Sequence, residues 1–526
     1  MQHSDFLPAS RPALVDPGSC DKWLERERFT DCHHACAAFI GLLDELEDAP
    51  PQAAACVLIL EKLRAPMHAA LDEQSRRFAG KALPLVPAED AAFARSCDLW
   101  LAQTRAWRRL LRASWSNAEL APDRARLALR TLECIAGLLT TQLSARRAIA
   151  PAHWRWLHQG YALAESENLA EVEVGAEGSP NTTCAAVYAH ALLMQLANSA
   201  ALAQREFVWA RRWARRWASK VRLWRSAENG GGLGVNLEGE AGAQWTPAGT
   251  PGAALRFVDC ALVARSIRSR LQKLAEGAGP DTLGLGKDCP PLAAQELLNT
   301  LLHCWSDAPQ SRQFPRRSTT GETELVASFA GIHQTIAGTA FSGEGAPWDY
   351  SRQRVEQIQV FQRVVDTRAL TPGVLLPERW QSLDESANGF RLRRGAAGVR
   401  LAHRQLLAIR PGGASQFILC EVRWLAQEQD GSISIGAKAL PGLPEPCSIR
   451  PAKASPLQSG IWTQAFALPL SKGLAPNLVL PIGWYQQGRE LDLKQSGEQF
   501  RIRLEELVER GHDYQRARFT ALGPRG

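Results

Sequence analysis

Two short motifs hold residues whose types and spacing suit a ligand that carries both phosphate and base groups. One is an R-x-x-x-R motif formed by Arg312 and Arg316, and the other is a D-x-S-x-x-G motif formed by Asp384, Ser386 and Gly389. A guanidinium can donate two parallel hydrogen bonds to a phosphate or to the acceptor edge of a guanine. A carboxylate accepts from N–H donors, a hydroxyl can donate or accept, and glycine lets a ligand approach the backbone closely. These residue types predict non-covalent binding.

The order of the motifs along the chain is more specific than either motif alone. R-x-x-x-R occurs by chance in a chain rich in arginine, and D-x-S-x-x-G could be a simple turn. Here the first motif precedes an expected strand at 324–329, and the second leads directly into another at 389–392. A strand containing V-R-W follows at 420–425, and the segment 434–440 ends in a G-x-x-x-L pattern. Several short strands separated by Gly and Pro indicate a small barrel.

The segment Arg312 to Leu440, about a quarter of the chain, resembles a PilZ domain in these motifs and their order. The resemblance implies a small antiparallel β-barrel that binds the bacterial second messenger cyclic di-GMP and needs no cofactor. It implies ligand contacts at Arg312, Arg316, Asp384, Ser386 and Gly389. The two arginines would hold guanine edges and phosphate, and the other three residues would line a pocket on the barrel face. Arg317 and Arg391 are weaker candidates, named for their proximity alone.

The interval between the two motifs is longer than PilZ domains usually have. It contains 67 residues, counted from the residue after Arg316 to the residue before Asp384. Apolar residues within it follow a helical period and predict an inserted helix near 350–368. A helix folded over the pocket would gate or abolish binding. A second interpretation therefore stays open, in which a degenerate barrel serves packing or partner contact.

Composition places the chain among ordinary multidomain globular proteins. Its 526 residues are 45% hydrophobic and 22% charged, which predicts three or four domains. The net charge of +7 is compatible with an anionic ligand without requiring nucleic acid. The N-terminus lacks a signal-peptide pattern, and no apolar run is long enough for a transmembrane segment. With 12 cysteines and no C-x-x-C pair, a cytoplasmic protein with reduced thiols is expected.

The expected fold class is multidomain α+β. Apolar residues recur at three- and four-residue spacing in the N-terminal part, which predicts helices separated at prolines. Beyond it the period changes to that of strands. The expected domains are an α-helical bundle at 20–225, a mixed connector at 226–306, a PilZ-like barrel at 307–440 and a small β-rich module at 441–526.

An arginine- and tryptophan-rich segment, 205–225, offers a competing function. Trp209, Trp213 and Trp217 recur every four residues and form one helical stripe, with arginines over much of the remaining surface. Such a helix could bind nucleic acid or an anionic membrane. The favoured interpretation is that the tryptophans pack into the bundle while the arginines reach solvent and pair with acidic neighbours. Nucleic acid is therefore not the expected partner.

The remaining motifs give no support for catalysis or metal binding. The segment Asp31 to Cys36 holds two cysteines and two histidines, but a zinc site normally needs a second pair of ligands, so buried thiols are expected instead. Gly230 to Gly234 matches no nucleotide-binding fingerprint and is interpreted as a hinge. Hydrolase, metalloprotease, kinase, cyclase and phosphodiesterase signatures do not occur, so no enzyme is expected.

These observations predict a cyclic di-GMP receptor with no metal. In this hypothesis, ligand binding rearranges the domains and transmits the level of the second messenger to a protein partner of the helical domain. The alternative is an adaptor or scaffold protein whose degenerate PilZ barrel no longer binds nucleotide. The downstream process, the oligomeric state and the ligand stoichiometry do not follow from the sequence.

Overall fold

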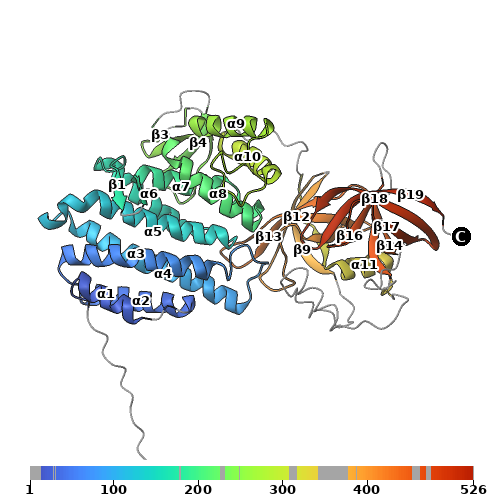
Figure 1. Cartoon of the computed structure of the whole chain (residues 1–526), viewed down its shortest axis with the longest axis horizontal. Helices are drawn as coiled ribbons and strands as arrows, with labels where there is room; N and C mark the ends of the chain where they lie inside the picture. The colour runs from blue at the N-terminus through green and yellow to red at the C-terminus, as the bar shows by residue number, and fades with distance from the viewer. Residues whose placement is uncertain are drawn as a thin grey trace, which may run out of the picture. The chain divides into compact units, whose positions relative to one another are not determined.

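The computed structural model describes residues 14–27, 29, 31–176, 179–225, 231–247, 249–250, 252–306, 317–341, 377–386, 388–452, 462–468 and 476–524. The chain divides into two compact units (Figure 1). Unit 1 comprises Met1–Lys81, Leu85–Ser311 and Gln427–Gln429, and unit 2 comprises Ala82–Pro84, Arg312–Ala426 and Asp430–Gly526. Arg312, Arg316 and the helix expected near 350–368 lie outside the described residues.

Unit 1 begins with a bundle of eight α-helices (Figure 1). They are α1 (Pro17–Arg26), α2 (Cys32–Asp48), α3 (Ala53–Ser75), α4 (Pro87–Ala113), α5 (Arg124–Ser144), α6 (Pro151–Ser166), α7 (Cys184–Leu196) and α8 (Gln204–Trp217). Local sequence sets several of their starts. Pro87 and Pro151 occupy the first helical position of α4 and α6, where a missing N–H costs nothing. Asp31 caps α2 by accepting from the backbone N–H groups of His33 and His34.

Helix α5 lies at the centre of this bundle and packs against α4, α6 and α7. It carries one buried charge, because only 3% of the Arg130 side chain is exposed. Arg130 Nε lies 2.7 Å from Glu61, and its Nη1 lies 2.8 Å from Glu133. Two carboxylates therefore compensate a guanidinium that has lost its water.

A small antiparallel sheet continues unit 1. Its strands are β3 (Arg222–Trp224), β4 (Gly231–Asn236), β5 (Gln244–Pro247) and β6 (Leu255–Asp259), in the order β3-β6-β4-β5. Two helices follow, α9 (Ala261–Ala275) and α10 (Pro291–Ser306), and a two-stranded hairpin, β1 (Val174–Ala176) and β2 (Ser179–Thr182), precedes α7. Val235 of β4 and Leu301 of α10 belong to the same hydrophobic core as the bundle. The region expected as a mixed connector, 226–306, thus shares the core of the helices.

The tryptophan stripe is buried, as the favoured interpretation predicts. Trp209, Trp213 and Trp217 are 5%, 0% and 1% exposed, and the indole N–H of Trp209 donates to Asp288 over 2.8 Å. Arg212 binds the same carboxylate at 2.7 Å. The hydrogen bond from Arg212, which has the larger effect, and the one from Trp209 lower the pKa of the Asp288 carboxyl to about 2. One detail of the prediction is wrong: the helix ends at Trp217, and residues 222–224 form strand β3.

The first half of unit 2 is an antiparallel barrel. Its strands are β7 (Arg317–Ser318), β8 (Glu322–Ala327), β9 (Glu378–Ser386), β10 (Gly389–Arg394), β11 (Leu406–Pro411), β12 (Ile418–Gln427) and β13 (Ile433–Ala439). The order is β10-β13-β12-β11-β8-β9, the pairing of β9 with β10 closes the ring, and β7 adds to β9. Helix α11 (Phe329–Ala337) follows β8. The predicted small antiparallel barrel is confirmed.

The second half of unit 2 is another closed barrel, where the sequence predicts a small β-rich module. Its strands are β14 (Glu445–Pro451), β15 (Thr463–Leu468), β16 (Asn477–Pro481), β17 (Glu490–Gln495), β18 (Glu498–Arg510) and β19 (Tyr514–Pro524), in the order β14-β15-β16-β19-β18-β17. Alternate side chains fill its interior. Closure leaves this sheet without an unpaired edge. The predicted α+β fold class is confirmed.

The two barrels of unit 2 share a hydrophobic cluster to which each contributes. Leu406 and Leu419 come from the first barrel, Phe466 and Val479 come from the second, and Ile332 of α11 completes the cluster. A polar contact also crosses the junction, because the Tyr514 hydroxyl donates to Glu421 over 2.6 Å. Because apolar and polar groups both cross this junction, the barrels pack on each other as a continuous structure.

No helix in the described ranges is long and apolar enough to cross a membrane. All 12 cysteines are free thiols. Within those ranges, no group of three or more His, Cys, Asp or Glu side chains is placed to hold a metal ion. In the segment 31–36, Cys36 is fully buried, and burial raises the pKa of its thiol to about 11. A thiol that stays protonated is a poor metal ligand.

Candidate functional site

The D-x-S-x-x-G motif forms the hairpin between β9 and β10. Ser386 pairs with Gly389, and Asp384 pairs with Arg391. Paired residues of antiparallel strands point to the same face, so Asp384, Ser386 and Arg391 share one face of the barrel wall. Leu392, the neighbour of Arg391 along β10, is fully buried. Since adjacent residues alternate between faces, the three polar side chains lie on the outer face.

A bulge in β9 directs Asp384 outward. Arg391 pairs with Asp384, but the next residue, Leu392, pairs with Ser382, which leaves Leu383 as the extra residue. Ser382 is 4% exposed and lies on the inner side with Leu392. Without the bulge, Asp384 would follow the alternation of Ser382 and face the interior. This single inserted residue therefore places the carboxylate on the outer face of the barrel wall.

Strand β7 brings the chain that follows the R-x-x-x-R motif beside this hairpin. Arg317 pairs with Glu385, and Ser318 pairs with Asp384. Although 67 residues lie between Arg316 and Asp384 in the sequence, the pairing of β7 with β9 brings Arg317 beside the second motif in space. Arg317 itself alternates with Ser318, so it does not share the face of Asp384.

An indole ring completes the outer face. The guanidinium carbon of Arg391 lies 6.0 Å from the centroid of the Trp424 ring. Gly436, which pairs with Arg391, lies beneath this ring, because a Cβ atom there would be 1.9 Å from Trp424 Nε1. Trp424 and Gly436 belong to the V-R-W and G-x-x-x-L strands, but the sequence interpretation did not assign either to the site. An aromatic residue opposite a strand glycine was the available signal.

Gly389 has a structural reason to be glycine. A Cβ atom there would lie 2.7 Å from the carbonyl oxygen of Ala437 on the neighbouring strand, which is closer than real contacts allow. The glycine of the motif thus permits β13 to approach the hairpin. Its predicted contact with a ligand stays a prediction.

The charges on this face leave a cation available. In the described part of the chain, Arg391 has no ion-pair partner, whereas Arg393, two residues along β10, binds Asp430 at 2.5 Å. Lys438 is exposed and pairs with Gly389. The outer face therefore offers cations, a carboxylate, a hydroxyl and an aromatic ring. Together they suit a ligand with phosphate groups, N–H donors and a flat base.

We expect Gly436→Ala to destabilise the first barrel by about 1–3 kcal/mol, because the new methyl group would overlap the Trp424 ring and displace it. Hydrogen exchange in peptides that cover β12 and β13 measures the change locally. Gly395→Ala is the matched control, because a Cβ at that position meets nothing within 4 Å. In a Trp424→Ala background, Gly436→Ala should lose most of its destabilising effect, because the ring that its methyl group would overlap is absent. An equal effect of Gly436→Ala in both backgrounds would contradict the contact.

Comparison with known families gives matches at both ends of the chain. A model described as the N-terminal domain of the cyclic-di-GMP receptor FimW matches residues 18–226, and a model described as the FimW C-terminal beta-barrel domain matches residues 447–522. Together they match more than half of the chain. The chain belongs to the FimW family of cyclic-di-GMP receptors. The FimW N-terminal match covers α2 to α8, and the candidate face on the first barrel lies between the two FimW matches. The predicted receptor family is confirmed.

Other comparisons add little to the FimW assignment. The solved structure of MrkH, titled "A novel c-di-GMP dependence transcription regulatory factor", aligns with 41% of this chain and 92% of its own at 11% identity and a TM-score of 0.13. At that TM-score the alignment supports no conclusion about fold or function. The curated proteins contain no significant sequence match.

Proposed function

We propose that this FimW-family chain binds cyclic di-GMP on the outer face of the first barrel. The observation that carries the proposal is the shared face of Asp384, Ser386 and Arg391 beside Trp424. The Asp384 carboxylate accepts from guanine N–H donors, and the Ser386 hydroxyl hydrogen-bonds beside it. The Arg391 guanidinium binds phosphate or the guanine acceptor edge, and the indole offers a stacking surface. Gly389 allows the ligand to approach the backbone.

Arg312 and Arg316 complete the proposed site from the chain that precedes β7. Consecutive Cα atoms are about 3.8 Å apart, so Arg316 is covalently within reach of the edge at which Arg317 pairs with Glu385. Two guanidiniums approaching from this edge would surround the ligand with positive charge. Arg317 and Arg391 are weaker candidates for ligand contact than Arg312 and Arg316.

The proposed output is mechanical and not catalytic. Binding would hold the Arg312–Arg316 segment against the barrel face, and this segment belongs to the connection between the two units. The arrangement of the units would then change, and with it a contact between the helical unit and a protein partner. A cytoplasmic receptor with no metal or cofactor fits this proposal.

Calorimetric titration of the full chain with cyclic di-GMP tests binding. We expect Arg316→Ala and Asp384→Asn each to weaken the affinity at least tenfold, because each removes a contact to a charged or polar edge that is worth about 1.4 kcal/mol or more. Arg379→Ala is the control: this arginine lies on the same strand β9, is 77% exposed and, among the described residues, forms an ion pair only with Glu322. No heat of binding, or wild-type affinity in Arg316→Ala, would refute the proposal and favour a barrel that does not bind nucleotide.

Small-angle X-ray scattering with and without saturating ligand tests the rearrangement separately. We expect the maximum dimension of the particle to change in wild type and to stay constant in Asp384→Asn. A profile that does not change when calorimetry shows binding would reject the mechanism of transmission and leave the binding proposal intact.

A further inference from the structure

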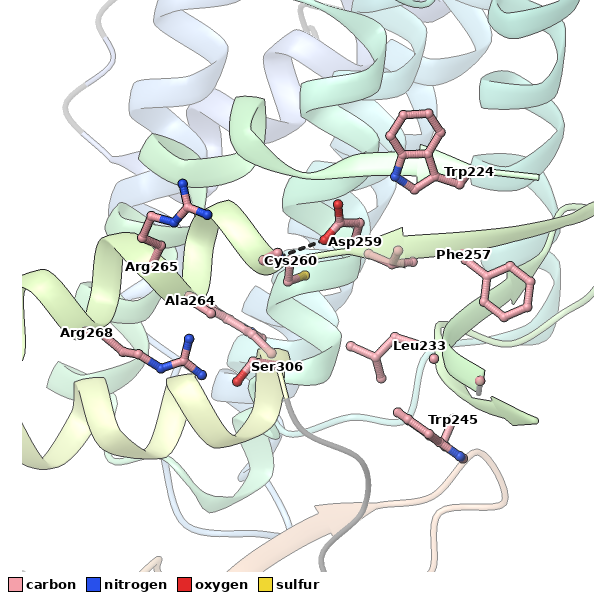
Figure 2. Close-up of a pocket in the computed structure, with 15 residues that line it drawn as sticks. Trp224, Leu233, Trp245, Phe257, Asp259, Cys260, Ala264, Arg265, Arg268 and Ser306 are labelled. Atoms are coloured by element: carbon pink, nitrogen blue, oxygen red, sulfur yellow. Dashed lines mark hydrogen bonds between the residues drawn. The ribbon is translucent and has the colours of Figure 1, made fainter. Parts of the chain in front are cut away.

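Unit 1 contains a pocket of about 630 Å³ between its small sheet and the helices α9 and α10 (Figure 2). Strands β3, β4, β5 and β6 form one side, α9 forms another, and the last residues of α10 close it. It lies almost wholly beyond residue 226 and before residue 447, the limits of the two FimW matches. Its volume is in the range of small-molecule sites, which is about 300–1,000 Å³.

One side of the pocket is aromatic. Trp224 is 43% exposed and pairs with Phe257 across β3 and β6, so these two rings share one face of the sheet. Trp245 pairs with Leu233, the neighbour of Gly234, which itself pairs with Phe257, so Trp245 lies on the other face. Large indoles are usually covered in a folded chain, so an exposed indole paired with a second ring at a pocket offers a stacking surface. Gly232 leaves this side uncovered, because a Cβ there would already lie 3.6 Å from the Phe257 ring. A longer side chain at that position would fill the space in front of the ring.

The opposite side of the pocket is basic. Arg265 and Arg268 both line it from α9 (Figure 2), and residues three apart on a helix have Cβ atoms roughly 5–6 Å apart. Neither guanidinium has an ion-pair or hydrogen-bond partner among the described residues. Arg270 on the same helix behaves differently, because it donates to the carbonyl oxygens of Leu283 and Ser266. Within the ranges that the structure describes, Arg265 and Arg268 are thus left without protein acceptors.

A carboxylate lies between the aromatic and basic sides. One oxygen of Asp259 accepts from the backbone N–H of Ala261 at 2.8 Å and so fixes the start of α9 (Figure 2). Its second oxygen can accept from a ligand N–H. The pocket therefore combines a stacking surface, an acceptor and two adjacent cations.

We propose that this pocket binds a nucleotide, with the base against Trp224 and Phe257 and the phosphate on Arg265 and Arg268. Two guanidiniums one helical turn apart can share the terminal oxygens of a phosphate monoester. Any base can stack on an indole, so stacking at this site would favour nucleotides as a class without distinguishing one base from another. An uncharged aliphatic ligand would leave both arginines unpaired, and a simple anion would leave the Trp224 ring exposed. The site is distinct from the proposed cyclic di-GMP face, because it belongs to the other unit.

Titration with GMP in an Asp384→Asn background tests the pocket after the barrel face has been weakened. We expect GMP to bind, and ribose 5-phosphate and guanosine, which each lack one half of the ligand, to bind at least tenfold more weakly. Trp224→Ala and the double variant Arg265→Ala/Arg268→Ala should each lower the GMP affinity at least tenfold. Trp115→Ala and Arg76→Ala are matched controls, with exposures of 39% and 75% in the same unit, and should leave it unchanged.

The outcomes separate the two sites. Cyclic di-GMP affinity of the otherwise wild-type chain should persist in Trp224→Ala, and loss of cyclic di-GMP binding in Asp384→Asn should leave GMP binding in place. Equal binding of ribose 5-phosphate and GMP would overturn the proposal by revealing a plain anion site. Absence of GMP binding, or GMP binding that survives both pocket variants, would also overturn it, whatever the result for cyclic di-GMP.

Discussion

Tyr514→Phe is expected to destabilise the junction between the two barrels by about 2–3 kcal/mol. The Tyr514 hydroxyl donates to Glu421 over 2.6 Å, and only 1% of that glutamate is exposed. Arg423 also binds the carboxylate, at 2.9 Å. Burial alone would raise the pKa of Glu421, but the Tyr514 hydroxyl and the nearby arginines outweigh it and lower the pKa. Losing one hydrogen bond to a buried charge leaves that charge partly unsatisfied.

Hydrogen exchange measures this change locally, which suits a chain of several units that has no single unfolding free energy. Peptides covering β12 and β19 should exchange roughly 30- to 150-fold faster, since each 1.4 kcal/mol corresponds to a factor of ten. Tyr485→Phe is the matched control, because its hydroxyl donates to the exposed Glu505 carbonyl. Equal rates in Tyr514→Phe and Tyr485→Phe would show that the buried contact does not hold the barrels together.

Strand β12 connects this junction to the candidate ligand face. It carries Glu421, which contacts the second barrel, and three residues later Trp424, which lies beside Arg391. A displacement of Trp424 by ligand would therefore act on a strand that also anchors Tyr514. This gives the second barrel, matched by a FimW family model, a physical route by which it could respond to the first.

Strand and helix periods predicted most of the fold because those periods reflect burial. The strands expected at 324–329 and 389–392 appear as β8 and β10, and the segments 420–425 and 434–440 fall on β12 and β13. The end of the Arg/Trp helix was missed, since the alternation in β3 spans only three residues. Closure of the C-terminal barrel was not predictable either, because closure depends on pairing between β14 and β17, far apart in sequence.

The sequence predicted the motif residues of the candidate site but not how they are arranged in space. The letters D-x-S-x-x-G identify a turn between strands, but they do not reveal the bulge at Leu383 that turns Asp384 outward. The pairing of β7 with β9 is likewise invisible in a sequence where the two strands lie far apart. Trp424 was read as part of a strand pattern, because an aromatic residue in a strand most often belongs to a core. Which face it occupies is settled by Gly436 on another strand.

Asp513→Asn is expected to stabilise the same junction at neutral pH and much less in acid. The Asp513 carboxylate accepts from the backbone N–H of Leu406 at 2.9 Å, and burial raises its pKa to about 6. A carboxyl with a raised pKa favours the folded state only while it is protonated. Its contribution is fully present below the unfolded pKa of about 3.9 and is lost as the pH rises through about 6. An amide keeps the acceptor for Leu406 and never ionises.

The advantage of Asp513→Asn over wild type should be on the order of 3 kcal/mol at pH 7.5 and on the order of 1 kcal/mol at pH 4.5, following from the shift from an ordinary pKa to about 6. Scanning calorimetry at the two pH values measures the difference on the transition of unit 2. Comparing the variant with wild type at each pH cancels the titration of neighbouring histidines and of Glu421, which both proteins retain.

Glu506→Gln is the control, because this carboxylate is 63% exposed on β18, and its effect should stay within about 0.5 kcal/mol at both pH values. An Asp513→Asn effect that is the same at pH 4.5 and pH 7.5 would mean that Asp513 titrates as an ordinary surface carboxyl. The hairpin between β18 and β19 would then contact β11 through a hydrogen bond that is insensitive to pH.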